Sequence, residues 1–238
     1  MGKITYNKQH IDTSDKKEVL KSLKNNLITT GPYVTKLEKK LCRYLKVKEV
    51  VTCSSGTSAL YIAMRSINLS KGDIIIIPAI NFIASVNMAT FLGAKIFLCD
   101  VDEFTGQMTP ENLIECIKIN KIKKIKAVIT MYLGGSPQNV LEFYKLKKKY
   151  NFFLIEDSCH ALGSSYKFKN RQIKIGSCLH SDISTFSLHP VKTITSGEGG
   201  FLSTNSKLLS RKFKLLRSHG IDRAKLSKRY WNYDVIFP

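Results

Sequence analysis

Residues 152–161 read Phe152-Phe153-Leu154-Ile155-Glu156-Asp157-Ser158-Cys159-His160-Ala161. The apolar run at the start of this stretch predicts a buried strand, which the acidic residues end. From Val50 onward, short runs of β-forming residues alternate with segments of helical apolar spacing. This alternation predicts an α/β fold, a three-layer sandwich with a mostly parallel, mixed seven-stranded sheet between helices. The strands are expected at 50–52, 74–77, 95–98, 127–130, 152–155, 183–186 and 200–203.

Two helices are expected before the first strand. Leu20, Leu23 and Leu27 share one face of the first helix, residues 15–27, and a second apolar face marks residues 34–46. No repeat, low-complexity tract or linker interrupts the chain. With 238 residues, of which 43% are hydrophobic, one domain can bury a substantial core.

Two residues carry the chemistry of a candidate site. Asp157 follows one predicted strand, and Lys192 follows another in Ser187-Leu188-His189-Pro190-Val191-Lys192. An open α/β sheet binds ligands at the carboxyl ends of its strands, so both should lie at one edge. A lysine amine can form a Schiff base with an aldehyde, and a carboxylate can keep a pyridine nitrogen protonated. The pair therefore indicates pyridoxal phosphate, although Lys192 alone could be a surface lysine and Asp157 alone a helix cap.

The motifs around these residues resemble a known family. They are Asp157-Ser158-Cys159-His160-Ala161, Ser187 to Lys192, Gly197-Glu198-Gly199-Gly200, Thr30-Gly31-Pro32, Ser54 to Leu60, Pro78 to Phe82 and Arg217-Ser218-His219-Gly220. Together they resemble the DegT/DnrJ/EryC1/StrS sugar aminotransferases, a branch of the fold-type-I pyridoxal phosphate enzymes. The resemblance spans nearly the whole chain. It implies the large domain of that fold over residues 1–238.

A phosphate seat is expected at the start of one helix. The segment Ser54 to Leu60 follows a strand and opens a helix, whose free N–H groups attract anions. Gly56 lets the backbone approach, and Thr57 adds a hydroxyl. The alternative for this segment is simple helix capping. The resemblance implies that Ser187 gives a further phosphate hydroxyl.

The resemblance also implies the remaining site roles. Lys192 would hold the cofactor aldehyde and carry protons, Asp157 would pair with the ring nitrogen, and His160 would reach the phenolic oxygen. Phe82 would stack on the ring. A structural histidine at His160 and a core position for Phe82 are the alternatives. Cys159 is interpreted as a packing residue.

The resemblance further implies transfer of an amino group from an amino acid, expected to be glutamate, to a nucleotide-linked keto-deoxy sugar. Similarity is greatest to the transaminases that act on UDP-linked 4-keto-hexoses of the pseudaminic acid pathway, in bacterial surface-polysaccharide or flagellin-glycan synthesis. Family members form homodimers and continue into a smaller C-terminal domain, and this chain is expected to stop before it. The alternative function is therefore a catalytically incompetent, cofactor-binding fragment. A related sugar dehydratase would carry histidine where Lys192 stands.

Charge alone gives another candidate class. The formal net charge is +20, from 38 basic and 18 acidic residues, which attracts polyanions. The basic runs Lys123–Lys126 and Lys145–Lys149 lie between predicted strands, where solvated helix faces and connections belong. No basic stretch is interleaved with stacking aromatic residues, so no nucleic-acid partner is expected.

Cysteine usage and hydropathy indicate the compartment. The six cysteines contain no Cys-x-x-Cys pair, which argues for reduced thiols and against a metal site. The N-terminus lacks an apolar signal core, and no run approaches the roughly 18 apolar residues that span a bilayer. A soluble cytoplasmic protein with no membrane partner is expected.

Overall fold

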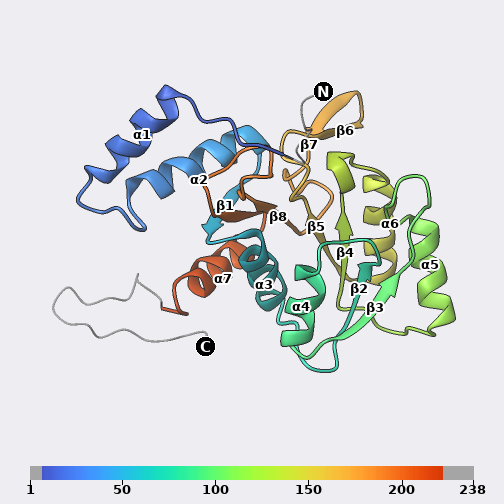
Figure 1. The fold of residues 1–238 in the computed structure, drawn as a ribbon. Helices are drawn as coiled ribbons and strands as arrows, with labels where there is room; N and C mark the ends of the chain where they lie inside the picture. Colours follow the sequence, from blue (N-terminus) through green and yellow to red (C-terminus); the bar gives the residue numbers. More distant parts are fainter. Residues whose placement is uncertain (1–6, 222–238) are drawn as a thin grey trace.

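A computed structural model describes residues 7–221 of the chain, and Figure 1 shows its layers. A seven-stranded sheet runs through it in the order β1-β9-β8-β5-β4-β2-β3. Only β9 is antiparallel to its neighbours, so the predicted mixed, mostly parallel sheet is confirmed. Its strands are β1 (Glu49–Cys53), β2 (Ile74–Pro78), β3 (Lys95–Cys99), β4 (Ala127–Met131), β5 (Phe153–Asp157), β8 (Ile183–Ser187) and β9 (Gly200–Thr204).

Helices cover both faces of this sheet (Figure 1). On one face, Ile75 and Ile77 of β2 pack in a core shared with α3 (Gly56–Ser66), α4 (Ala84–Phe91) and α7 (Lys207–Arg217). On the other, Ile76 packs with α5 (Pro110–Ile119) and α6 (Val140–Tyr150). The same second face carries α2 (Pro32–Leu45) over the stacked rings of Phe186 and Phe201. Side-chain alternation in the strands thus produces the three layers.

The first helix, α1 (Thr13–Leu23), contributes no buried residue. Asp12 caps it by accepting the Ser14 and Asp15 N–H groups, while Leu20 is 63% exposed. The helix ends at Leu23, so the prediction that it continues to residue 27 is wrong. Asn25 and Asn26 are poor helix formers, and no buried contact extends the helix across them.

A two-stranded hairpin was not predicted. It consists of β6 (Ser165–Phe168) and β7 (Arg171–Lys174), joined by Lys169 and Asn170. Both joining residues have positive φ, 45° and 58°, as a two-residue hairpin turn requires. The Tyr166 hydroxyl lies 2.5 Å from Nδ1 of His180. Because His180 is buried, this contact holds the hairpin against the body of the domain.

Within residues 7–221, every helix is too short or too polar to cross a bilayer. The same residues contain no cluster of three or more histidine, cysteine or acidic side chains that could hold a metal ion.

Candidate active site

Four chain segments meet at one edge of the sheet. β5 ends at Asp157 and β8 ends at Ser187, while β9 begins at Gly200 because it runs in the opposite direction. β1 ends at this edge with Cys53, paired to Gly200. Asp157 is the last residue of β5. The strand therefore continues two residues beyond the predicted end at residue 155, and Asp157 lies within it rather than after it.

Asp157 is a buried carboxylate. Its Oδ1 accepts a hydrogen bond from the Cys159 backbone N–H at 3.2 Å. Burial raises the pKa of Asp157, because the charged form loses its hydration, while the charges of His160 and Lys192 act in the opposite direction. A cation beside this carboxylate therefore favours its ionised form.

His160 and Lys192 lie within electrostatic reach of Asp157 and of each other. His160 is half-buried, and burial, followed by the charge of Lys192, lowers its pKa. Lys192 is also half-buried, and its backbone N–H donates to the His189 carbonyl at 2.9 Å in a turn. Three predicted residues from two motifs, Asp157 and His160 from one and Lys192 from the other, are thus brought together at the edge of the sheet.

The amino end of α3 lies at the same edge of the sheet, next to Ser187 and Cys159. Ser55 caps the helix by accepting the Ser58 N–H at 3.0 Å, and the first helical N–H groups have no acceptor within the helix. Gly56 is buried; a Cβ there would lie 2.9 Å from the Ser187 Cβ and 3.3 Å from the Cys159 Sγ. Gly56 thus allows α3 to approach the ends of β8 and β5, and Cys159 packs there as interpreted from the sequence.

Gly200 lies against the amino end of α3. A Cβ on Gly200 would overlap the Ser55 carbonyl and lie 2.8 Å from the Gly56 nitrogen. Gly200 therefore permits direct contact between β9 and the amino end of α3.

Thr57 and Phe82 make no hydrogen bond with Asp157 in the described residues. Thr57 is the second residue of α3 and is half-buried. Phe82 follows β2, two strands away from β5, and is 70% exposed, so it is not a core residue. In the described part of the chain, no hydrogen bond or ring contact joins either side chain to Asp157.

Sequence reasoning missed a buried polar network beside the site. Glu156 accepts hydrogen bonds from the Tyr132 hydroxyl at 2.7 Å and from the Ser184 hydroxyl. Burial raises the pKa of Glu156. Because neighbouring strand residues point to opposite faces, Glu156 lies in the sheet's other layer from Asp157. The adjacent Glu156 and Asp157 after an apolar run could have indicated this network, because two buried carboxyl groups both need hydrogen-bond partners.

The donor set suits a phosphorylated pyridine aldehyde. A buried carboxylate suits a protonated ring nitrogen, an amine suits an aldehyde, and a helix amino end cleared by Gly56 suits a phosphate. The residues present therefore fit pyridoxal phosphate.

The fold is that of the large domain of the fold-type-I pyridoxal phosphate-dependent transferases, as the comparisons with solved structures show. The chain belongs to the DegT/DnrJ/EryC1/StrS aminotransferase family, whose model matches residues 9–235.

Relatives with assigned activities are sugar transaminases. The chain is 40% identical over 233 residues to the UDP-4-amino-4,6-dideoxy-N-acetyl-beta-L-altrosamine transaminase of Campylobacter jejuni, covering 98% of this chain and 58% of that one. PseC of Helicobacter pylori, an aminotransferase involved in the biosynthesis of pseudoaminic acid, matches with a TM-score of 0.83 and 31% identity, over 98% of this chain and 60% of that one. A Streptococcus pneumoniae protein solved in its PLP form matches with a TM-score of 0.85 and 28% identity, over 99% and 61%. The chain thus spans less than two thirds of their length.

Proposed function

We propose that this chain forms the cofactor-binding part of an enzyme that transfers an amino group to a nucleotide-linked keto-deoxy sugar. The observation that carries the proposal is the meeting of buried Asp157 with Lys192 and His160 at the carboxyl edge of the sheet. The sugar transaminase names of relatives that match nearly all of this chain support the substrate class. Its two substrates would be this nucleotide-linked keto-deoxy sugar and an amino-acid donor. The family resemblance indicates glutamate as the donor.

Each site residue has a defined task in this proposal. Pyridoxal phosphate, when bound, supplies an electron-withdrawing ring that stabilises negative charge on the substrate carbon. Lys192 would hold the cofactor through its side-chain amine and would serve as the base and acid that moves a proton during amino transfer. Asp157 would pair with the ring nitrogen and keep it protonated.

The other residues bind and orient the cofactor. Gly56 and Thr57 offer backbone N–H groups and a hydroxyl to the phosphate, and Ser187 gives a second hydroxyl. His160 would bond the phenolic oxygen, and Phe82, whose ring is exposed, would cover one face of the cofactor. We further propose a cytoplasmic homodimer, in which a second copy completes the site. The net charge of +20 would draw the nucleotide diphosphate toward it.

An absorbance titration with pyridoxal phosphate tests this assignment. The wild-type chain should develop a near-visible band, and reduction with borohydride should leave the cofactor mass on Lys192 in a peptide map. Lys192→Ala should lose both signals. Lys124→Ala removes an exposed lysine that is distant in sequence from Lys192, and this variant should keep both signals. A cofactor mass found on scattered lysines in the wild type would contradict the proposal.

A second candidate is cofactor binding without amino transfer, because the arrangement of Asp157, Lys192 and the amino end of α3 bears on the cofactor alone. The two candidates separate when glutamate is added to the cofactor-loaded chain. Amino transfer predicts that the near-visible band shifts and that 2-oxoglutarate appears in equal amount. A stable band without 2-oxoglutarate would favour a binding fragment.

A further inference from the structure

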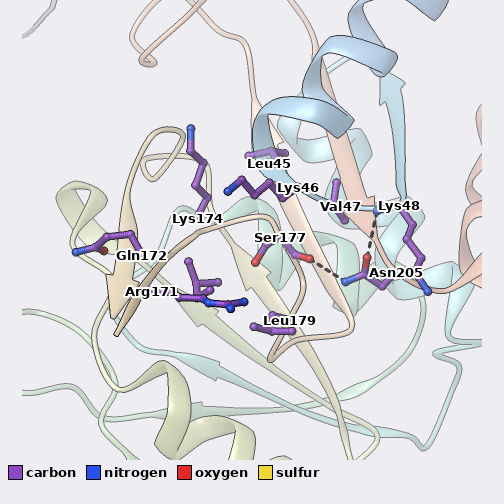
Figure 2. Close-up of a pocket in the computed structure, with 11 residues that line it drawn as sticks. Leu45, Lys46, Val47, Lys48, Arg171, Gln172, Lys174, Ser177, Leu179 and Asn205 are labelled. Atoms are coloured by element: carbon purple, nitrogen blue, oxygen red, sulfur yellow. Dashed lines mark hydrogen bonds between the residues drawn. The ribbon is translucent and has the colours of Figure 1, made fainter. Parts of the chain in front are cut away.

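A hollow of about 860 Å³ lies at the opposite edge of the sheet from Asp157 and Lys192 (Figure 2). Lys48 precedes β1, Ser177 precedes β8, and Asn205 follows the antiparallel β9. All three therefore lie where the parallel strands begin. The hollow is distinct from the candidate active site.

Cations dominate the polar lining of this hollow. Lys46, Lys48, Arg171 and Lys174 line it, and no acidic residue does (Figure 2). They come from separate segments, the connection between α2 and β1 and the strand β7. Within residues 7–221, none of the four forms an ion pair. These cations border one concave surface that has no acidic lining residue, which leaves a positive potential there.

The frame of the hollow is held by hydrogen bonds. The Asn205 carboxamide donates to the Ser177 carbonyl at 2.8 Å and to the Cys178 carbonyl at 2.9 Å. Its oxygen accepts the Lys48 N–H at 3.1 Å. The Lys174 ammonium lies 3.2 Å from the centre of the Tyr44 ring, which restrains that side chain. The backbone around the hollow is thus held in place before any ligand binds, which limits the entropic cost of ordering these segments.

Apolar side chains form the rest of the wall. Leu45, Val47, Ile173 and Leu179 line the hollow beside the cations. Leu179 is largely exposed, although it is a large hydrophobic residue. A bare inorganic anion would leave this apolar surface in contact with water, whereas an organic ring would cover it.

We propose that this hollow binds a nucleoside diphosphate. The guanidinium and ammonium groups would take the diphosphate, for which charge-assisted hydrogen bonds are strong, and the apolar wall would take the base or ribose. The volume lies within the range of about 300–1,000 Å³ that is usual for small-molecule sites. Such a ligand would bind independently of the chemistry at Lys192.

Calorimetric titration of the cofactor-saturated chain with uridine diphosphate and with inorganic pyrophosphate tests this site. One uridine diphosphate should bind per chain, more tightly than pyrophosphate. The double variant Arg171→Gln/Lys174→Gln should weaken uridine diphosphate binding by about tenfold or more. Lys123→Gln/Lys124→Gln removes the same charge from exposed positions elsewhere and should change affinity by less than about twofold.

Hydrogen exchange shows where the ligand sits. With uridine diphosphate bound, amides of residues 46–48 and 171–174 should exchange more slowly, and those of residues 187–192 should not change. Equal weakening in the two double variants would overturn the proposal, because the net charge alone would then explain binding. Protection confined to residues 187–192, or no binding at millimolar ligand, would also overturn it. Lys192→Ala should retain uridine diphosphate binding, which separates this test from that of the proposed function.

Discussion

A side chain at Gly56 would bring its Cβ to 2.9 Å from the Cβ of Ser187. Real Cβ atoms are essentially never this close, so α3 can approach β8 only because residue 56 is glycine. Gly56→Ala should therefore destabilise the fold by about 1–3 kcal/mol, the usual cost of inserting a methyl group into packed surroundings. Urea denaturation of the cofactor-free chain measures this loss.

The matched control for Gly56→Ala removes the opposing atom. In the double variant Gly56→Ala/Ser187→Gly, the loss should be smaller than the sum of the two single losses, because the clashing Cβ is absent. Strict additivity would show that the two residues do not limit each other.

The pH dependence of stability should report the burial of Asp157. Its folded pKa is raised above the ordinary value of 3.8, so its contribution to stability is present below pH 3.8 and is lost as the pH rises through the folded pKa. Relative to Asp157→Asn, the cofactor-free wild type should become less stable from pH 4 upward. Urea denaturation across pH 4–7 checks this trend.

Asp102 gives a control of opposite sign. Hydrogen bonds from the Thr105 hydroxyl and N–H lower its pKa, so its contribution is present above pH 3.8 and is lost as the pH falls through the folded pKa. Asp102→Asn should therefore show its difference from wild type shrinking in acid. The same trend in both variants would mean that burial does not set the behaviour of Asp157.

Arg217 should stabilise the contact between three elements. Its Nη1 donates to the Glu38 carboxylate of α2 at 2.6 Å and to the Thr52 carbonyl of β1 at 3.3 Å. The two side chains are only 25% and 16% exposed. Arg217→Ala should cost about 1–3 kcal/mol, because a hydrogen-bonded charge loses its partner away from water.

The comparison for Arg217 is the exposed pair Lys21 and Glu18 on α1, whose charged atoms are 3.7 Å apart. Lys21→Ala should change stability by less than about 0.5 kcal/mol, as is typical of solvent-exposed ion pairs. Similar losses in Arg217→Ala and Lys21→Ala would refute a special role for the half-buried pair.

The network around Glu156 predicts a cost for removing one hydroxyl. Tyr132→Phe leaves the buried Glu156 carboxyl without one donor and should destabilise by about 1–3 kcal/mol. Tyr61→Phe keeps the half-buried ring that contacts Phe91 and should stay within about 0.5 kcal/mol. Thermal unfolding of both variants measures the contrast, and equal melting temperatures would contradict it.

The sequence predicted the sheet because the strands are short runs of apolar and β-branched residues between helical segments. The hairpin β6–β7 was missed because Lys169-Asn170 lacks the Asn-Gly or Asp-Gly signature of such turns. Asp157 and Lys192 could be placed at one edge from the rule for parallel sheets. The close approaches of Gly56 to Ser187 and of Gly200 to Ser55 could not be predicted from the sequence. They depend on how closely α3 packs against strands that are distant from it in sequence.

The pairing of β1 with β9 sets an order of events during synthesis. Within residues 7–221, β1 is the first strand and lies at an edge of the sheet, with Glu49 opposite Thr204 and Cys53 opposite Gly200. It has no partner until residue 204 has left the ribosome, although β2 and β3 can pair much earlier. Contacts so distant in sequence slow folding and leave an unpaired strand available for aggregation. A nascent chain that stalls before residue 200 would therefore carry β1 unpaired beside a partly formed sheet, and this strand would be exposed to aggregation.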